Sequence, residues 1–302
     1  MKYGPDYLSP TSINQYLDDI EEFFLRYIVR VPRSPQTQPM AIGSAFDACI
    51  KAFLVTHYSE DGYDKERHGT LYQEFLQQEV EEQHREWAYT QGIIIYNMYK
   101  SVGALDNLLN DVEPGSLETL DKLLRVVTIN GLDVPLLGKP DLLWISKAHG
   151  CKIVDDWKCN GACSPHNKSP HPGYVDIFPS RNIHKDCLLV NGVNVLDMHQ
   201  DYSLQLTVYK ILTGAEIVGI NQLVFGKAPV GTIGDLRVAL HRHRVSPERE
   251  KQVLDAAHQV WSNISNYERG GPFSSISAER CELLWKQGEL FKDPVERLLS
   301  GR

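Results

Sequence analysis

The sequence lacks any long hydrophobic run: none of its apolar stretches approaches the roughly 18 residues that a membrane span requires. The opening residues, Met1–Asp6, also lack the apolar core of a secretory signal. We therefore expect a cytoplasmic protein with no membrane partner. In that compartment its six cysteines are expected to be reduced thiols rather than disulfides. The chain contains no internal repeat, which argues against a repeat architecture.

Positive charge is also scarce. The chain has 31 Lys and Arg against 39 Asp and Glu, a net charge of −8. This balance argues against a protein that coats nucleic acid through a basic surface. It leaves open an enzyme that contacts a short stretch of backbone, because metal-binding acids themselves add negative charge. The region from Arg237 to Lys251 is locally basic, and it fits either a solvated face or a strand or helix start that contacts phosphate.

What the chain does have is the composition of a folded globular protein, with 42% hydrophobic and 23% charged residues. Apolar periodicity predicts helices at 11–30, 42–57, 93–109, 201–212, 246–267 and 278–285. Ser12 and Gln15 fit a capping box at the start of the first helix. Alternation predicts strands at 126–129, 134–137, 141–145, 152–158, 222–225 and 236–243. We expect an α+β fold with a mixed central sheet flanked by helices, in which residues 1–115 form an N-terminal helical portion and residues 116–302 form the core, integrated into one domain.

The strands at 141–145 and 152–158 predict a hairpin with its turn near 148–150. In that hairpin Asp141 falls within about one residue of being opposite Asp156, and directly opposed residues hold their Cβ atoms roughly 4.5–5.5 Å apart. Two carboxylates at that distance repel each other unless a cation lies between them, and Mg²⁺ takes such oxygen ligands. Lys158 adds a positive charge where an anionic transition state forms. Taken alone, the same residues also fit the charged ends of a solvated hairpin.

Strand alternation distinguishes the two neighbouring acids. Asp156 and Lys158 project to one face, whereas Asp155 and Trp157 project to the other. Asp155 is therefore expected either to support the metal-binding residues from behind or to have a purely structural role. On the next predicted helix, Gln205 and Tyr209 lie four positions apart and so share one face.

The ordered motifs Gly43-x3-Asp47, Gly138-x2-Asp141, Asp156-Trp157-Lys158 and Gln205-x3-Tyr209 resemble the PD-(D/E)xK nuclease superfamily. They most resemble its RecB-like exonuclease branch, which includes CRISPR-associated exonucleases and phage-encoded members. The similarity covers about residues 9–213. It implies a restriction-endonuclease-like core and, for a phage-encoded chain, a location in the host cytoplasm.

The resemblance implies a role for each motif. Asp141 and Asp156 would bind Mg²⁺ or Mn²⁺ together with the backbone carbonyl of Trp157, and Lys158 would assist the attacking water or the scissile phosphate. The helix with Gln205 and Tyr209 would contact DNA or support the catalytic lysine.

Asp47 stands where the family commonly has a histidine that serves as a further metal ligand. An aspartate is a harder donor and so a better Mg²⁺ ligand. It would make the site more anionic and able to hold two ions. The other possibility is an exposed helix aspartate.

Two other metal centres are not expected. Some members of the family carry an iron–sulfur cluster on one early cysteine and three closely spaced late ones, and this chain has no late cysteine triplet. The other is zinc: Cys159-x3-Cys163 with His166 and His171 offers tetrahedral ligands, but the spacing is irregular and fits a plain insertion equally well.

The function that follows from the resemblance is a metal-dependent DNA exonuclease acting on DNA ends in recombination, repair or phage DNA processing. Two alternatives stay open: an endonuclease of the same superfamily with sequence or structure specificity, and a non-catalytic nucleic-acid-binding module that keeps the fold. The complete set of two acids and a lysine argues against the non-catalytic module.

Overall fold

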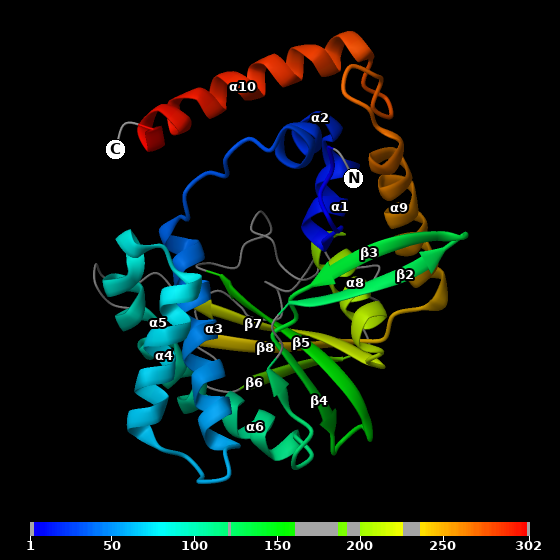
Figure 1. Ribbon diagram of the computed structural model, residues 1–302. Coiled ribbons are helices and arrows are strands. Elements are labelled where there is room, and N and C mark those ends of the chain that lie inside the picture. Colours follow the sequence, from blue (N-terminus) through cyan, green and yellow to red (C-terminus); the bar gives the residue numbers. More distant parts are fainter. Residues whose placement is uncertain (1–2, 120–121, 161–186, 192–199, 226–235, 301–302) are drawn as a thin grey trace. The chain divides into compact units, whose positions relative to one another are not determined.

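The computed structural model describes residues 3–119, 122–160, 187–191, 200–225 and 236–300 (Figure 1). The chain forms two compact units. The first contains Met1–Pro35, Lys122–Gly138 and Ser246–Arg302, and the second contains Gln36–Asp121 and Lys139–Val245. These units do not follow the expected division near residue 115, because the helices that precede that point pack with the sheet that follows it.

The second unit is built on a six-stranded mixed sheet. In spatial order its strands are β1 (Glu118–Thr119), β4 (Leu142–Ser146), β5 (Cys151–Asn160), β7 (Ile217–Phe225), β8 (Leu236–His243) and β6 (Cys187–Asn191). The β5–β7 and β6–β8 pairs are parallel, and the other neighbours are antiparallel. The expected α+β class with a mixed central sheet is confirmed.

Strands β4 and β5 form the predicted hairpin. Their register runs from the Leu142–Asp155 pair to the Ser146–Cys151 pair, and Gly150 closes the turn with a φ of 61° that favours glycine. Asp141 precedes the first of these pairs, which places it opposite Asp156. Its backbone N–H donates to the carbonyl of Asp155 at 3.2 Å.

Helices cover both faces of this sheet. They are α3 (Gln38–His57), α4 (Lys65–Glu79), the short η2 (Glu82–His84), α5 (Arg85–Ser101), α6 (Ala104–Asp111) and α8 (Gln200–Thr213). On one face Trp157 packs edge-on against Phe46 of α3 and Tyr99 of α5. On the other face, α8 packs on β5 and β7. The helix expected at 93–109 is two helices, because Gly103 adopts a φ of 77° between them.

Helix α3 is more apolar than the sequence patterning suggested. Among the described residues it is the one helix long and apolar enough to cross a membrane by composition, with a mean hydropathy of 1.3. Core helices of soluble proteins have the same property, and 67% of this stretch is buried. Ala45, Phe46 and Ile50 lie in the hydrophobic core of the second unit, alongside Trp144 of the sheet.

The first unit joins helices to a β-ribbon. Its elements are α1 (Pro10–Asp18), α2 (Ile20–Phe23), the π-helix η1 (Phe24–Val29), β2 (Leu123–Ile129), β3 (Leu132–Gly138), α9 (Pro247–Asn266) and α10 (Ala278–Ser300). Strands β2 and β3 form a two-stranded sheet and are joined by a turn at Asn130-Gly131, whose φ angles are 50° and 80°. Leu8 adds an isolated parallel bridge to Leu136 of β3.

The single helix expected at 11–30 is wrong in two respects. Asp19 is extended, with φ −149° and ψ 97°, and its side chain caps α2, so the chain turns there. The capping box uses Ser9 and Ser12 instead of Ser12 and Gln15. Stacked and edge-on contacts of Phe23 and Phe24 with Phe273 then fill the core of this unit.

Candidate active site

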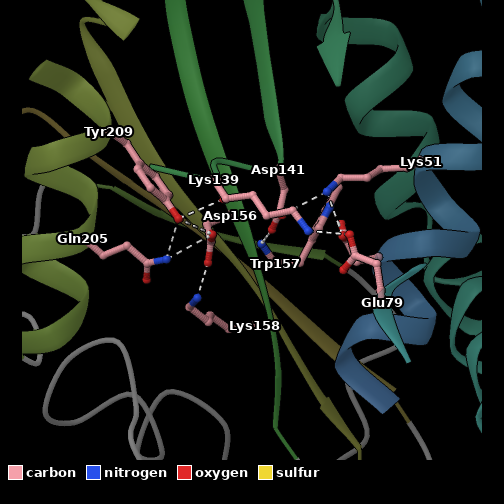
Figure 2. Close-up of polar contacts among 10 residues, drawn as sticks. Lys51, Glu79, Lys139, Asp141, Asp156, Trp157, Lys158, Gln205 and Tyr209 are labelled. Atoms are coloured by element: carbon pink, nitrogen blue, oxygen red, sulfur yellow. Dashed lines mark hydrogen bonds and ion pairs between the residues drawn. The ribbon is translucent and has the colours of Figure 1, made fainter. Parts of the chain in front are cut away.

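Asp141 lies at the centre of a cluster of acids and lysines within the second unit (Figure 2). Its Oδ2 accepts a hydrogen bond from the backbone N–H of Trp157 at 2.7 Å. The N–H and C=O of a strand residue face the same edge of the strand. The Trp157 carbonyl therefore points to the edge of β5 where Asp141 lies, one position beyond the hairpin pairing.

Asp156 lies on the α8 side of Asp141 and is 3% exposed. Its Oδ1 accepts from Gln205 Nε2 at 3.3 Å. The Tyr209 hydroxyl lies 3.3 Å from the same oxygen and 3.0 Å from the Lys139 carbonyl, and it donates its single proton to one of them at a time. Gln205 also donates to that hydroxyl at 2.7 Å, and Lys158 forms an ion pair with Asp156 Oδ2. The structure thus brings four predicted residues together.

Burial and neighbouring charge set the protonation of this group. Burial raises the pKa of Asp156 to about 6, with a further upward contribution from the charge of Asp141, while Lys158 opposes both. Burial lowers the pKa of Lys158, but the charge and hydrogen bond of Asp156 outweigh it, and the net direction is upward. The ammonium also lies 5.6 Å from the centre of the Tyr202 ring, over its face. Lys158 is therefore a fixed cation.

Asp47 lies among a second set of charges, on α3. Its Oδ2 is 2.7 Å from the ammonium nitrogen of Lys51, which is also 3.3 Å from Asp141 Oδ1. Asp47 is 8% exposed, so it is not the exposed helix aspartate of the alternative interpretation. Its Oδ1 is buried and has no hydrogen-bond partner among the described residues. An ion pair between Lys139 and Glu79 lies nearby (Figure 2).

Lys51 is a site residue that the sequence reasoning missed. The available signal was its position four residues after Asp47, on the same helix face. Its second partner, Asp141, lies 90 positions away in the sequence.

The three acids do not form a single ligand group. Asp141 is shared, and Lys51 and Lys158 lie on opposite sides of it (Figure 2). Burial and the charge of Asp141 raise the pKa of Asp47 well above its usual range. Within the described ranges, no three His, Cys, Asp or Glu side chains converge as a metal-binding group. Each half of the cluster instead has its own lysine, Lys51 beside Asp47 and Lys158 beside Asp156.

The donor atoms nevertheless suit a hard divalent ion. They are carboxylate oxygens and a backbone carbonyl, which Mg²⁺ and Mn²⁺ prefer. Each carboxylate offers about four lone-pair positions, so the hydrogen bonds on Asp141 and Asp156 leave room for an ion. The partnerless buried oxygen of Asp47 is a further donor. The proposed zinc ligands Cys163, His166 and His171 lie outside the described residues, and burial raises the pKa of the Cys159 thiol, which disfavours the thiolate.

Asp155 projects to the opposite face, as alternation predicts. It is 0% exposed and is held by Arg242 Nη1 at 2.6 Å and Asn221 Nδ2 at 2.5 Å. Burial raises its pKa to about 6, even though Arg242 opposes the shift. Arg242 also lies over the Trp144 ring, 5.4 Å from its centre.

The central residues of the basic run at Arg237–Lys251 neither form a solvated face nor are available to contact phosphate. Arg242 is committed to Asp155, and His241 and His243 are buried. Where the structure describes this run on β8, it is therefore neither a solvated face nor a phosphate-contacting strand.

Comparison with known protein families finds a match to one family model. A family model described as the PD-(D/E)XK nuclease superfamily matches residues 7–174, more than half of the chain. No curated protein matches. Solved structures that match include one titled "Crystal structure of SSO0001", with 14% sequence identity, a TM-score of 0.30, and coverage of 86% of this chain and 85% of that chain. A TM-score this low carries no argument.

Proposed function

Because the chain belongs to the PD-(D/E)XK nuclease superfamily, we propose that it is a metal-dependent DNA exonuclease that hydrolyses phosphodiester bonds at DNA ends. The observation that carries the proposal is the convergence of Asp141, Asp156 and Lys158 at one end of the β4–β5 hairpin. The order of the four motifs supports the RecB-like branch. It also supports a place in recombination, repair or phage DNA processing, in the cytoplasm.

In this proposal the acids bind the metal ion and the lysine neutralises charge on the phosphate. Asp141 and Asp156, with the Trp157 carbonyl, would hold Mg²⁺ or Mn²⁺. Such an ion, when bound, polarises a phosphate oxygen and lowers the pKa of a water molecule. Lys158 keeps a positive charge beside Asp156, where it neutralises charge that develops on the phosphate.

Gln205 and Tyr209 act on Asp156 from α8. Their hydrogen bonds to Oδ1 fix the rotamer of the carboxylate and leave Oδ2, next to Lys158, toward the reaction. Tyr209 also reaches the Lys139 carbonyl, two positions before Asp141, so the same hydroxyl links both metal-binding acids.

The test is cleavage of end-labelled linear DNA, single- and double-stranded, in Mg²⁺ or Mn²⁺. We expect activity in the wild type and its loss in Asp156→Asn and Lys158→Ala. Lys152→Ala is the matched control, because Lys152 is an exposed lysine on the same strand. Equal activity in all four proteins would sink the proposal.

Covalently closed circular DNA separates the two nuclease alternatives. An exonuclease leaves it intact, whereas cleavage that depends on Asp156 would indicate the endonuclease. DNA binding without metal-dependent cleavage of any substrate would favour the non-catalytic module.

A further inference from the structure

Lys51 stands between two carboxylates of the site, where a cation neutralises them. It reaches Asp47 Oδ2 and Asp141 Oδ1, at 2.7 and 3.3 Å. The three side chains are only 11–13% exposed. The ammonium group of Lys51 therefore occupies the position between the two carboxylates where a metal cation would otherwise bind.

A positive charge suits this position, because two carboxylates lie within reach of one nitrogen in a nearly buried place, where water screens their mutual repulsion poorly. The Lys51 ammonium group supplies that charge by contacting both acids at once.

The two lysines differ in how many acids they contact. Lys51 bridges acids from two separate elements, α3 and the start of the β4–β5 hairpin. Within the described residues Lys158 forms its ion pair with Asp156 alone. The Lys158 side chain is also 23% exposed, whereas that of Lys51 is 11% exposed. Lys51 is therefore the more firmly held of the two cations.

We propose that Lys51 takes the place of a second divalent ion, so that the centre binds a single ion at Asp141 and Asp156. Two-metal sites hold their ions about 3.5–4 Å apart. Asp141 is in the position of a carboxylate shared by two such ions, but in this chain one of the cations is Lys51. The inference rests on the proposed metal-dependent function. It changes the expected role of Asp47 from metal ligand to partner of Lys51.

The experiment counts Mn²⁺ ions bound to the purified full chain by isothermal titration calorimetry. We expect one ion in the wild type and two in Lys51→Met, which keeps an unbranched side chain one atom shorter than lysine and removes its charge. The double variant Asp47→Asn/Lys51→Met should return to one. Lys139→Met is the matched control: it removes a lysine charge of the same cluster that is paired with Glu79, and it should stay at one.

Thermal unfolding supplies a second readout, because Lys51→Met leaves two buried carboxylates facing each other without metal. Mn²⁺ should raise the Tm of Lys51→Met more than that of the wild type. Equal stoichiometry with equal Tm shifts, or two ions in the wild type, would overturn this inference and leave the proposed function intact. Absence of Mn²⁺ binding to both proteins would overturn both.

Discussion

Replacing Arg242 by methionine tests the buried ion pair on the face of β5 opposite the candidate site. Asp155 and Arg242 form an ion pair on the face of β5 opposite Asp156, and the Arg242 side chain is 9% exposed. Burial raises the pKa of Asp155 from 3.8 to about 6 with Arg242 in place. Keeping that carboxylate ionised at pH 7 in the folded protein thus already costs about 3 kcal/mol relative to the unfolded chain. Removing one partner of a buried pair costs about 3–5 kcal/mol.

The expected loss depends on pH, with a definite sign. Because the folded-state pKa of Asp155 is raised, the folded protein binds more protons than the unfolded chain between pH 4 and 6, and the stability from this group falls as pH rises. Without Arg242 the pKa rises further. Arg242→Met should therefore lose about 1.4 kcal/mol more at pH 7 than at pH 5, because Asp155 ionises near pH 6 with the arginine in place and stays protonated to higher pH without it.

Urea unfolding followed by circular dichroism at both pH values measures this loss. Arg244→Met is the matched control, since Arg244 lies two residues further along the chain, directly after β8, where its side chain is 66% exposed and lies 3.7 Å from Glu216. Its loss should stay below about 1 kcal/mol. Equal losses for the two variants, or a loss for Arg242→Met that does not change with pH, would refute the reasoning.

Three further substitutions test the surroundings of the site. Gly219→Ala should destabilise the protein by about 1–3 kcal/mol in urea unfolding, because its Cβ would overlap the carboxylate of Asp155; an unchanged midpoint would contradict this. Tyr202→Ala should lower kcat/KM up to about tenfold by removing the ring under Lys158, whereas Tyr202→Phe should not, and equal rates would exclude the cation–π contact. Tyr209→Phe should lower kcat with its fold kept by circular dichroism, since the hydroxyl holds a metal-binding carboxylate; a wild-type kcat would remove that role.

Local patterning was enough to predict the β4–β5 hairpin and the placement of its acids. The two-residue period of β5 separates Asp156 from Asp155, and the position of the turn sets Asp141 opposite Asp156. These features depend on residues close together in the sequence. For the same reason Gln205 and Tyr209 could be placed on one helix face before the structure was known.

Features that depend on distant partners could not be predicted in this way. The sequence gives no sign that Lys51 differs from other helix lysines, because its partner Asp141 is distant in the sequence. Likewise Arg242 is one member of a basic run, and only the fold shows that it is buried in an ion pair with Asp155. The β2–β3 ribbon has the same alternation as β4 and β5, so nothing local shows that it forms a separate sheet. The break at Asp19 arises because its side chain caps α2, and apolar periodicity does not detect helix caps.

The position of β5 as the third of six strands has a consequence for hydrogen exchange. Its backbone is paired with β4 on one edge and β7 on the other, and its core residues are buried. Amide hydrogens in such a strand exchange only through the largest openings of the protein. The carboxylate of Asp156 is therefore carried by a slowly exchanging cooperative unit, and α8 packs on that unit through the buried side chains of Leu206 and Tyr209.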